Sequence, residues 1–428
     1  MQRNQANSRI RSLSLLTVVG GLGLISAFGL EGSASAQGSL SAQRVPGLTA
    51  EQLEILSHLE IVYLDDGQGG TVKTIQLSGA NLRIVNGLGA TNGRPEEPDS
   101  ELQDTNGLGN LIVGYNELGN PAGDFRRGSH NVVVGHGNSY EGCGGIVAGR
   151  DNGIVGVYAS VVGGQENRAV GFFSSIGGGR ANVAFGEHAA VGGGWNNLAS
   201  GDFASVGGGQ ENDASGPYSA VGGGRANEAE GESSSVAAGW NNEARAQYSS
   251  VSGGWNNDAD GQSSSVSGGQ DNTAGGPASS VSGGRDNSAN SLAASVSGGM
   301  QNDANGEHSS VSGGAFNFAK AMGSSVSGGS EHQVFASADY GAITGGWNNR
   351  VSQPHGSVTG GALNQANAFC ASVTGGEDND ADGAYSSVTG GEFNHAHATW
   401  SSVSGGRGTS AGGAGDWAVG LDYYWAQP

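Results

Sequence analysis

The sequence predicts an all-β protein built mainly as a single-stranded β-solenoid of fifteen-residue coils, with a small helix and strand cap at its N-terminal side. A branched residue recurs every fifteen residues over 146–326 and, after an insertion of two residues, over 343–403. Asn over 167–317 and Ala over 169–319 keep the same period. Self-similarity at one fixed period indicates a repeat architecture. The 83 glycines and 36% apolar residues also argue against a conventional globular core.

One repeat is seen clearly at 250–264, which reads Ser-Val-Ser-Gly-Gly-Trp-Asn-Asn-Asp-Ala-Asp-Gly-Gln-Ser-Ser. Both halves alternate small or apolar residues with polar ones, as in a strand with one buried face. A Gly ends each half and supplies the positive φ of a tight corner. Two strands and two corners per coil predict two parallel sheets with coils about 4.8 Å apart. We expect an interior ladder formed by a Val column and by Asn amides that bond to neighbouring coils, represented by Val251, Val266, Val281, Asn242, Asn257 and Asn272.

Residues 1–36 have the pattern of a secretory signal peptide. A basic segment with Arg3, Arg9 and Arg11 precedes an apolar stretch over 13–30, and Ala34-Ser35-Ala36 fits a cleavage site. A spanning helix is the alternative, which the glycines in the apolar stretch disfavour. We therefore expect a secreted or cell-surface protein whose mature chain has no integral membrane anchor.

Residues 37–107 are expected to form a linker and an N-terminal cap. Thr49 and Gln52 fit the capping box of a helix over 49–59. Strand patterns follow at 60–64, 71–77 and 81–85. The helix either covers the open end of the roll or bundles with the same helix of other protomers.

The repeat domain is predicted over 108–420, and an aromatic C-terminal cap over 421–428. The repeat domain starts irregularly at 110–114 and 131–135, with an insertion between these segments. Its fifteen-residue period is interrupted by two additional residues within 331–340. About 21 coils would give a rod of about 100 Å.

The phrase x-Asn-x-Ala-x-Gly-x-x-Ser-Ser-Val-Ser-Gly-Gly resembles the head repeats of YadA-like trimeric autotransporter adhesins. It is also similar to the repeats of a grass-type ice-binding β-roll. The resemblance covers roughly 108–420 and implies a left-handed β-roll and, from the adhesins, a parallel homotrimer. The chain departs from the adhesin pattern because it shows neither a long coiled-coil stalk nor a C-terminal anchor barrel.

Two cysteines, Cys143 and Cys370, each stand three residues before a branched residue of the repeat and are expected to share one column. A separation of fifteen coils excludes a disulfide between them within one chain. Either both are free thiols, or each pairs with its counterpart in another chain.

A formal charge of −21 makes nucleic acid an improbable partner, because phosphate would be repelled. The outward acids Asp213, Glu228, Glu243 and Asp258 fall in one column. Calcium would bridge such like charges. The alternative is solvated repulsion relieved by Arg245, and no other cofactor is expected.

No nucleophile–His–acid motif, H-E-x-x-H motif or helix-opening GxGxxG motif is present, so we expect no enzyme activity. One cluster has metal-ligand character, because two His and two Asp occupy the same columns of successive coils. His with carboxylate suits zinc or nickel, and imidazolium–carboxylate pairing is the alternative. The cluster comprises Asp380, Asp382, His395 and His397.

Two surface features could bind other molecules. Hydroxyl columns flank the Val column, and a flat array of this kind is typical of an ice-binding face or of close packing between protomers. Tryptophans after the Gly-Gly pair either bind glycan or protein or cover the edge of the stack. The candidates are Ser357, Thr359, Ser372, Thr374, Ser387, Thr389, Trp240 and Trp255. The sequence thus predicts a structural or adhesive rod that binds an extracellular surface, matrix protein or glycan, with ice binding as the alternative.

Overall fold

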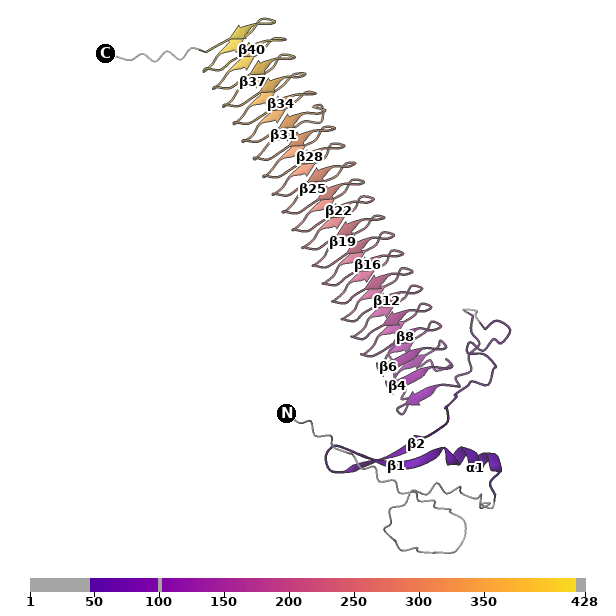
Figure 1. Ribbon diagram of the computed structural model, residues 1–428. Helices are drawn as coiled ribbons and strands as arrows, with labels where there is room; N and C mark the ends of the chain where they lie inside the picture. Colours follow the sequence, from indigo (N-terminus) through magenta and orange to yellow (C-terminus); the bar gives the residue numbers. More distant parts are fainter. Residues whose placement is uncertain (1–46, 99–101, 421–428) are drawn as a thin grey trace. The chain divides into compact units, whose positions relative to one another are not determined.

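The computed structural model describes residues 47–98 and 102–420 (Figure 1). The contacts divide the chain into two compact units, Met1–Arg83 and Ile84–Pro428, and each is considered by itself. The expected signal peptide at 1–36 and the expected aromatic cap at 421–428 lie outside the described residues.

The first unit contains one helix and one hairpin. Helix α1 (Ala50–Ser57) has the expected capping box: the Gln52 N–H donates to the Thr49 hydroxyl at 3.2 Å, and the Thr49 N–H donates to the Gln52 side chain at 2.9 Å. Strands β1 (Leu59–Asp65) and β2 (Thr71–Leu77) pair in antiparallel fashion. The helix therefore ends before Leu59, which already belongs to β1.

The third strand expected at 81–85 is wrong, because 81–86 forms no strand. The backbone there bonds to side chains instead of to a ladder. The Asn86 N–H donates to the His130 ring at 3.1 Å, and the Asn86 side chain accepts from the Leu88 N–H at 2.9 Å. The segment is thus a loop, and its residues from Ile84 onward belong to the second unit.

The second unit is the expected β-solenoid, in which successive coils stack with their strands parallel (Figure 1). One sheet carries the recurring Val and is called the Val sheet; the other carries the recurring Ala and is called the Ala sheet. They contain 21 and 19 strands. In both sheets a strand pairs with its counterpart one coil away, so Val251 lies opposite Val266 and Ala259 opposite Ala274.

The Val sheet begins with three longer strands and continues with two-residue strands. Its strands are β3 (Leu111–Val113), β4 (Val132–His136), β6 (Ile146–Arg150), β8 (Ser160–Val161), β10 (Ser175–Ile176), β12 (Ala190–Val191), β14 (Ser205–Val206), β16 (Ala220–Val221), β18 (Ser235–Val236), β20 (Ser250–Val251), β22 (Ser265–Val266), β24 (Ser280–Val281), β26 (Ser295–Val296), β28 (Ser310–Val311), β30 (Ser325–Val326), β32 (Ala342–Ile343), β34 (Ser357–Val358), β36 (Ser372–Val373), β38 (Ser387–Val388), β40 (Ser402–Val403) and β42 (Trp417–Ala418).

The Ala sheet consists of two-residue strands throughout. Its strands are β5 (Ser139–Tyr140), β7 (Gly153–Ile154), β9 (Arg168–Ala169), β11 (Val183–Ala184), β13 (Leu198–Ala199), β15 (Asp213–Ala214), β17 (Glu228–Ala229), β19 (Glu243–Ala244), β21 (Asp258–Ala259), β23 (Thr273–Ala274), β25 (Ser288–Ala289), β27 (Asp303–Ala304), β29 (Phe318–Ala319), β31 (Gln333–Val334), β33 (Arg350–Val351), β35 (Gln365–Ala366), β37 (Asp380–Ala381), β39 (His395–Ala396) and β41 (Ser410–Ala411).

Each coil also has a third line of parallel pairing, which the sequence analysis did not predict. The residue after the Gly-Gly pair forms a single bridge to its counterpart, as in Trp240 to Trp255 and Trp255 to Gln270. Because this third side contains only one bridged residue per coil, it has no alternation of polar and apolar residues by which the sequence could have revealed it.

The start of the Val column differs from the prediction. Val161 pairs with Val147 and not with Ile146, which is 44% exposed. The coil from Val147 is one residue shorter than later coils, because Gly149 alone stands where they have Gly-Gly. The two-residue slip is found within the expected 331–340 region, since the extra residues lie between Val334 and Ile343.

A ladder of buried Asn side chains runs the length of the roll. The Asn257 N–H donates to the Asn242 side-chain oxygen at 3.1 Å, and the Asn272 N–H donates to that of Asn257 at 3.1 Å. The Asn257 amide nitrogen donates to the carbonyls of Gly253 at 3.0 Å and Gly269 at 3.1 Å. Each Asn thus satisfies turn backbone in two coils, which is necessary because these groups are buried.

Glycine has two different roles at the corners. Gly254 has φ +96°, but Gly261, which ends the other half of the repeat, is not left-handed. A Cβ on Gly261 would collide with the carbonyl of Gly276 in the next coil, so close approach requires Gly there. The remaining left-handed corners hold other residues, such as Asn256 (φ 54°) and Ser263 (φ 57°), and the prediction of a left-handed Gly at every corner is therefore wrong.

In some coils of the thin core, a larger residue in the Ala column is matched by a smaller inward residue in the same coil. Where the Ala column holds Val334 or Val351, the small inward residue two positions before the next column residue of the Val sheet is Gly. A Cβ on Gly356 would lie 2.7 Å from Val351 Cγ1. The same exchange occurs at Gly341 with Val334, at 2.8 Å from Cγ1, and a Cβ on Gly145 would lie 2.8 Å from Cδ1 of Ile154 in the next coil.

Candidate functional site

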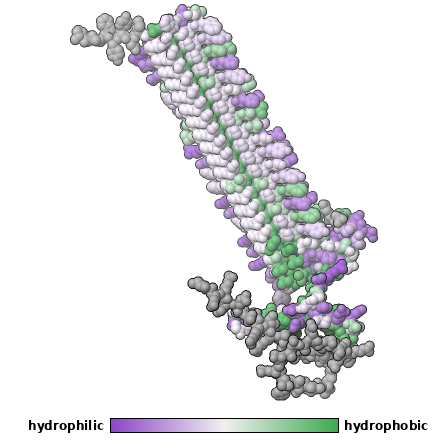
Figure 2. Space-filling model, viewed as in Figure 1, coloured by the Kyte–Doolittle hydropathy of each residue, from purple (hydrophilic) through white to green (hydrophobic). Residues whose placement is uncertain are grey.

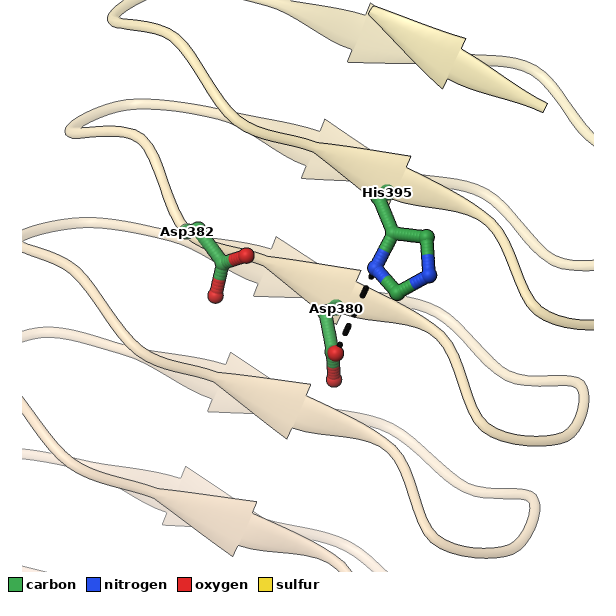
Figure 3. Close-up of side chains that lie close together, drawn as sticks. All are labelled: Asp380, Asp382 and His395. Carbon is green, nitrogen blue, oxygen red and sulfur yellow. Dashed lines mark ion pairs between the residues drawn. The ribbon is translucent and has the colours of Figure 1, made fainter. Parts of the chain in front are cut away.

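The side chains best suited to bind a metal ion are those of Asp380, Asp382, His395 and His397, which we call the Asp/His cluster. Asp380 pairs with His395 in the Ala sheet, and the buried Ala381 and Ala396 leave the flanking positions outward. His395 Nδ1 lies 3.4 Å from Asp380 Oδ2 (Figure 3). His397 Nδ1 lies 3.2 Å from Asp382 Oδ2. The structure therefore brings all four predicted residues together on one face.

Three of these residues approach a metal-binding arrangement. One ligand atom each from Asp380, Asp382 and His395 lies within 4.8 Å of the other two, and Figure 3 shows the three side chains on adjacent coils. Among the described residues, no other group of three His, Cys, Asp or Glu side chains has this property. The rings of His395 and His397 are stacked, with centroids 5.3 Å apart.

Burial raises the pKa of Asp380 above its usual value, and the neighbouring Asp382 carboxylate adds to this increase. The nearby His395 acts in the opposite direction. Asp380 Oδ1 is shielded from solvent and has no hydrogen-bond partner, and the shielded His395 Nδ1 has only its 3.4 Å contact to Asp380 Oδ2. Unpaired polar atoms of this kind are costly, and a proton or a cation would relieve the cost.

The hydroxyl columns lie on the outer face of the Val sheet, where the sequence placed them. Thr359, Thr374 and Thr389 are exposed, and the Ser before each column Val is half-buried. The register aligns Ser357 with Ser372 and Ser372 with Ser387. The result is two straight hydroxyl lines parallel to the axis of the roll.

Trp240 and Trp255 lie in the line of single bridges and are 49% and 42% exposed. Their rings stack on each other at 5.5 Å, and the Arg225 guanidinium lies 5.9 Å from the Trp240 ring. Both faces of Trp240 are therefore covered. A sugar needs an open aromatic face, and Trp347 is better placed because its neighbours in the line are Ser330 and Ala362.

A second aromatic column was missed by the sequence analysis. It occupies the left-handed corner three residues before the column Val, where Tyr158, Phe173, His188, Phe203 and Tyr218 stack in succession. A second run extends from Tyr340 to Trp400, but its middle member Phe369 stands one residue before the left-handed Cys370 and contacts both neighbouring rings edge-on. The column is interrupted by Ser263 and Ala278, which hid it in the sequence. Figure 2 shows that hydrophilic and hydrophobic residues follow lines along the visible face of the roll.

The acidic column is partly neutralised by one cation. The Arg245 guanidinium contacts Glu243, lies 3.6 Å from Asp258 and lies 2.8 Å from Asp260. Asp213 lacks such a partner, and burial, together with repulsion from Glu228 and Glu230, raises its pKa to about 6. The repulsion within the acidic column is thus reduced by Arg245 near Asp258 and by the raised pKa of Asp213 at the other end of the column.

The prediction that the cysteines share one column is wrong. The Tyr158 N–H bonds to the Cys143 carbonyl, whereas the Cys370 N–H itself bonds to the Pro354 carbonyl. Cys143 therefore occupies the position of Pro354, one residue before that of Cys370, as follows from the shifted start of the Val column. Cys143 is buried, Cys370 is half-buried, and both are free.

The comparisons with known proteins give no relative for this chain. No protein-family model matches it, and no curated protein is significantly similar. No helix among the described residues is long and apolar enough to cross a membrane. Arguments about function therefore depend on the fold and its surface.

Proposed function

We propose that the chain is a secreted or cell-surface repeat protein that serves as a structural and adhesive rod and not as an enzyme. A β-solenoid is a fold typical of such proteins, and the parallel register continues through both sheets. The observation that carries the proposal is this constant register, because it repeats each outward side chain at the spacing of the coils, about 4.8 Å. An extended surface, matrix protein or glycan could contact many equivalent positions at once.

Multivalent contact lets weak individual interactions add up to useful affinity. The outer face of the Val sheet suits this role, because its Ser and Thr columns are straight and small. Trp347 and Trp195, each 46% exposed, have no ring stacked on them within the described residues. They are the tryptophans best placed to contact sugars.

The test is surface binding of the mature chain, from Gln37 onward, measured by surface plasmon resonance on collagen, fibronectin, chitin and cellulose. The variant Thr359→Lys/Thr374→Lys/Thr389→Lys places three charges on the Val sheet. The control Ser288→Lys/Gln333→Lys/Gln365→Lys adds the same charge to the Ala sheet, where these residues are half-buried and face outward. Loss of binding in the first variant alone supports the proposal, and no binding to any extended ligand contradicts it.

Ice binding is the second candidate, favoured by the in-register hydroxyl columns. The exposed Thr359, Thr374 and Thr389 follow one another at successive coils. If these columns bind ice, the purified protein shows thermal hysteresis and inhibits recrystallisation, and the triple Lys variant does neither. Absence of both activities in the unmodified protein ends this hypothesis.

A parallel homotrimer is proposed as the working assembly. The small residues on the Val sheet permit close approach, and the exposed apolar residues Ile55 and Leu56 of α1 supply a surface that protomers could share. In register, the half-buried Cys370 thiols of neighbouring chains would face one another. Analytical ultracentrifugation decides the matter, because a monomer at micromolar concentration contradicts the trimer.

A further inference from the structure

The Asp/His cluster has a backbone that holds its side chains in place. The Asp380 and Asp382 N–H groups bond to the carbonyls of Asn394 and Ala396 in the next coil, both at 2.9 Å. Four potential ligands therefore extend from two adjacent strands whose spacing is fixed by the sheet. A site of this kind needs little backbone movement to bind an ion, which favours affinity.

The distances between the facing atoms suit a small divalent ion. With bonds of about 2.0–2.1 Å, the ligand atoms of a tetrahedral zinc site lie roughly 3.3–3.4 Å apart. The two His–Asp pairs, at 3.4 Å and 3.2 Å, already have this separation. Asp380, Asp382 and His395 already have one ligand atom each within 4.8 Å of the other two, so a site with four ligands also needs the His397 ring to move toward them.

The cluster also has features that a simple ion pair does not need. Asp382 Oδ1 accepts from the Asn367 amide at 2.9 Å, which orients the carboxylate as outer hydrogen bonds do at metal sites. Asp380 Oδ1 has no hydrogen bond and His395 Nδ1 has only the 3.4 Å contact to Asp380 Oδ2, although both atoms are shielded from water. A cation between them would satisfy both atoms.

The identity of the ion follows from the ligands. Two imidazoles with two carboxylates suit zinc, whereas calcium prefers six to eight oxygen ligands. The acidic column around Arg245 offers only oxygens and already has its own cation. We propose that the Asp/His cluster is a zinc site that joins two successive coils near the C-terminal end of the roll.

The proposal is tested by calorimetric titration of the untagged mature protein with zinc chloride, in a Cys370→Ser background that removes the half-buried thiol. One zinc ion per chain should bind. Asp380→Asn/His395→Gln should weaken binding at least tenfold, and Asp382→Asn/His397→Gln should do the same. Because all four side chains face outward, the circular dichroism of both variants should remain that of the parent.

The matched control is Glu307→Gln/His308→Gln. Glu307 and His308 form a His–carboxylate pair at 3.6 Å but belong to no described group of three ligands. This variant should bind zinc like the parent. No saturable zinc binding, equal binding by all variants, or tighter binding of calcium than of zinc overturns the proposal. Zinc binding is measured without any surface ligand, so this outcome and that of the adhesion assay are independent.

Discussion

Val351 is larger than the usual Ala of its column, and Gly356 is smaller than the Ala at the equivalent position of the next coil. This pair gives the sharpest test of how the core is packed. The next coil has Ala366 and Ala371 at the equivalent positions, both fully buried. The double variant Val351→Ala/Gly356→Ala therefore reproduces a pair that the protein already contains. Each single change disturbs the packing in the opposite direction, and the two changes together should restore it.

The magnitudes follow from the contacts. Val351→Ala removes the equivalent of about two methylene groups, which costs about 1.6 kcal/mol of burial, and a residual cavity raises the loss to about 2 kcal/mol. Gly356→Ala places a Cβ 2.7 Å from Val351 Cγ1. Overpacking of this kind costs about 1–3 kcal/mol, of which a lower unfolded-state entropy returns about 0.4–1 kcal/mol.

Urea unfolding followed by circular dichroism measures the effect as a change in midpoint at constant slope. If the two costs were independent, the double variant would lose about 3–4 kcal/mol of unfolding free energy. Compensation predicts a loss below about 1 kcal/mol, hence a coupling energy of about 2 kcal/mol or more. A double variant as unstable as the sum of the single changes would refute the volume argument.

Three further predictions concern the buried polar groups. Asn257→Ala leaves the Asn272 N–H and the Gly253 carbonyl unpaired, and the Gly269 carbonyl keeps only the Trp255 N–H. It should lower the unfolding free energy by more than about 2 kcal/mol, as measured by urea unfolding, and an unchanged midpoint contradicts the role of the ladder. Asp213 has a folded pKa of about 6, above its usual value of 3.8, so its contribution to stability is fully present below about pH 4 and is lost as pH rises through 6. Asp213→Asn should therefore raise the melting temperature at pH 8 but not at pH 4, and an equal shift at both pH values would argue against this assignment. Burial lowers the pKa of His332, which replaces Asn in the ladder, below its usual value of 6.5. Its contribution to stability is therefore present above pH 6.5 and is lost as pH falls. His332→Asn should stabilise the protein more at pH 5 than at pH 8, and thermal melts with the same gain at both pH values would contradict it.

The sequence was sufficient for the architecture because every coil repeats the same information. Val and Asn recur many times, so the buried faces of Val251 and Asn257 could be deduced from period alone. The Asp/His cluster could also be located, because a strand places alternate residues on one face and the period places Asp380 next to His395. The prediction thus succeeded wherever the same residue type recurred every fifteen residues over many coils, or where two successive coils had matching positions.

The prediction failed where a pattern was short or interrupted. Ile146 and Val147 are both branched, and only the missing second Gly near Gly149 reveals which one points inward. The same shift displaced Cys143 from its expected column. The aromatic column was hidden because its left-handed position holds Tyr218 in one coil and Ser263 in another. The ion pairs of Arg245 agree with the expected relief of the acidic column, although the spacing could not specify which acids the side chain reaches.

The hydrogen bonds of the Asn ladder connect each coil to its immediate neighbours. Each Asn backbone N–H donates to the side chain of the Asn in the preceding coil, as Asn272 does to Asn257. The Asn side-chain nitrogen donates in turn to the next coil, as Asn257 does to the Gly269 carbonyl, so each coil contacts only the coils on either side of it. For the same reason, removing fifteen residues such as 252–266 would shorten the rod by one step and leave equivalent contacts at the junction. Length is then an adjustable property, set by copy number and independent of the surface chemistry that each coil displays.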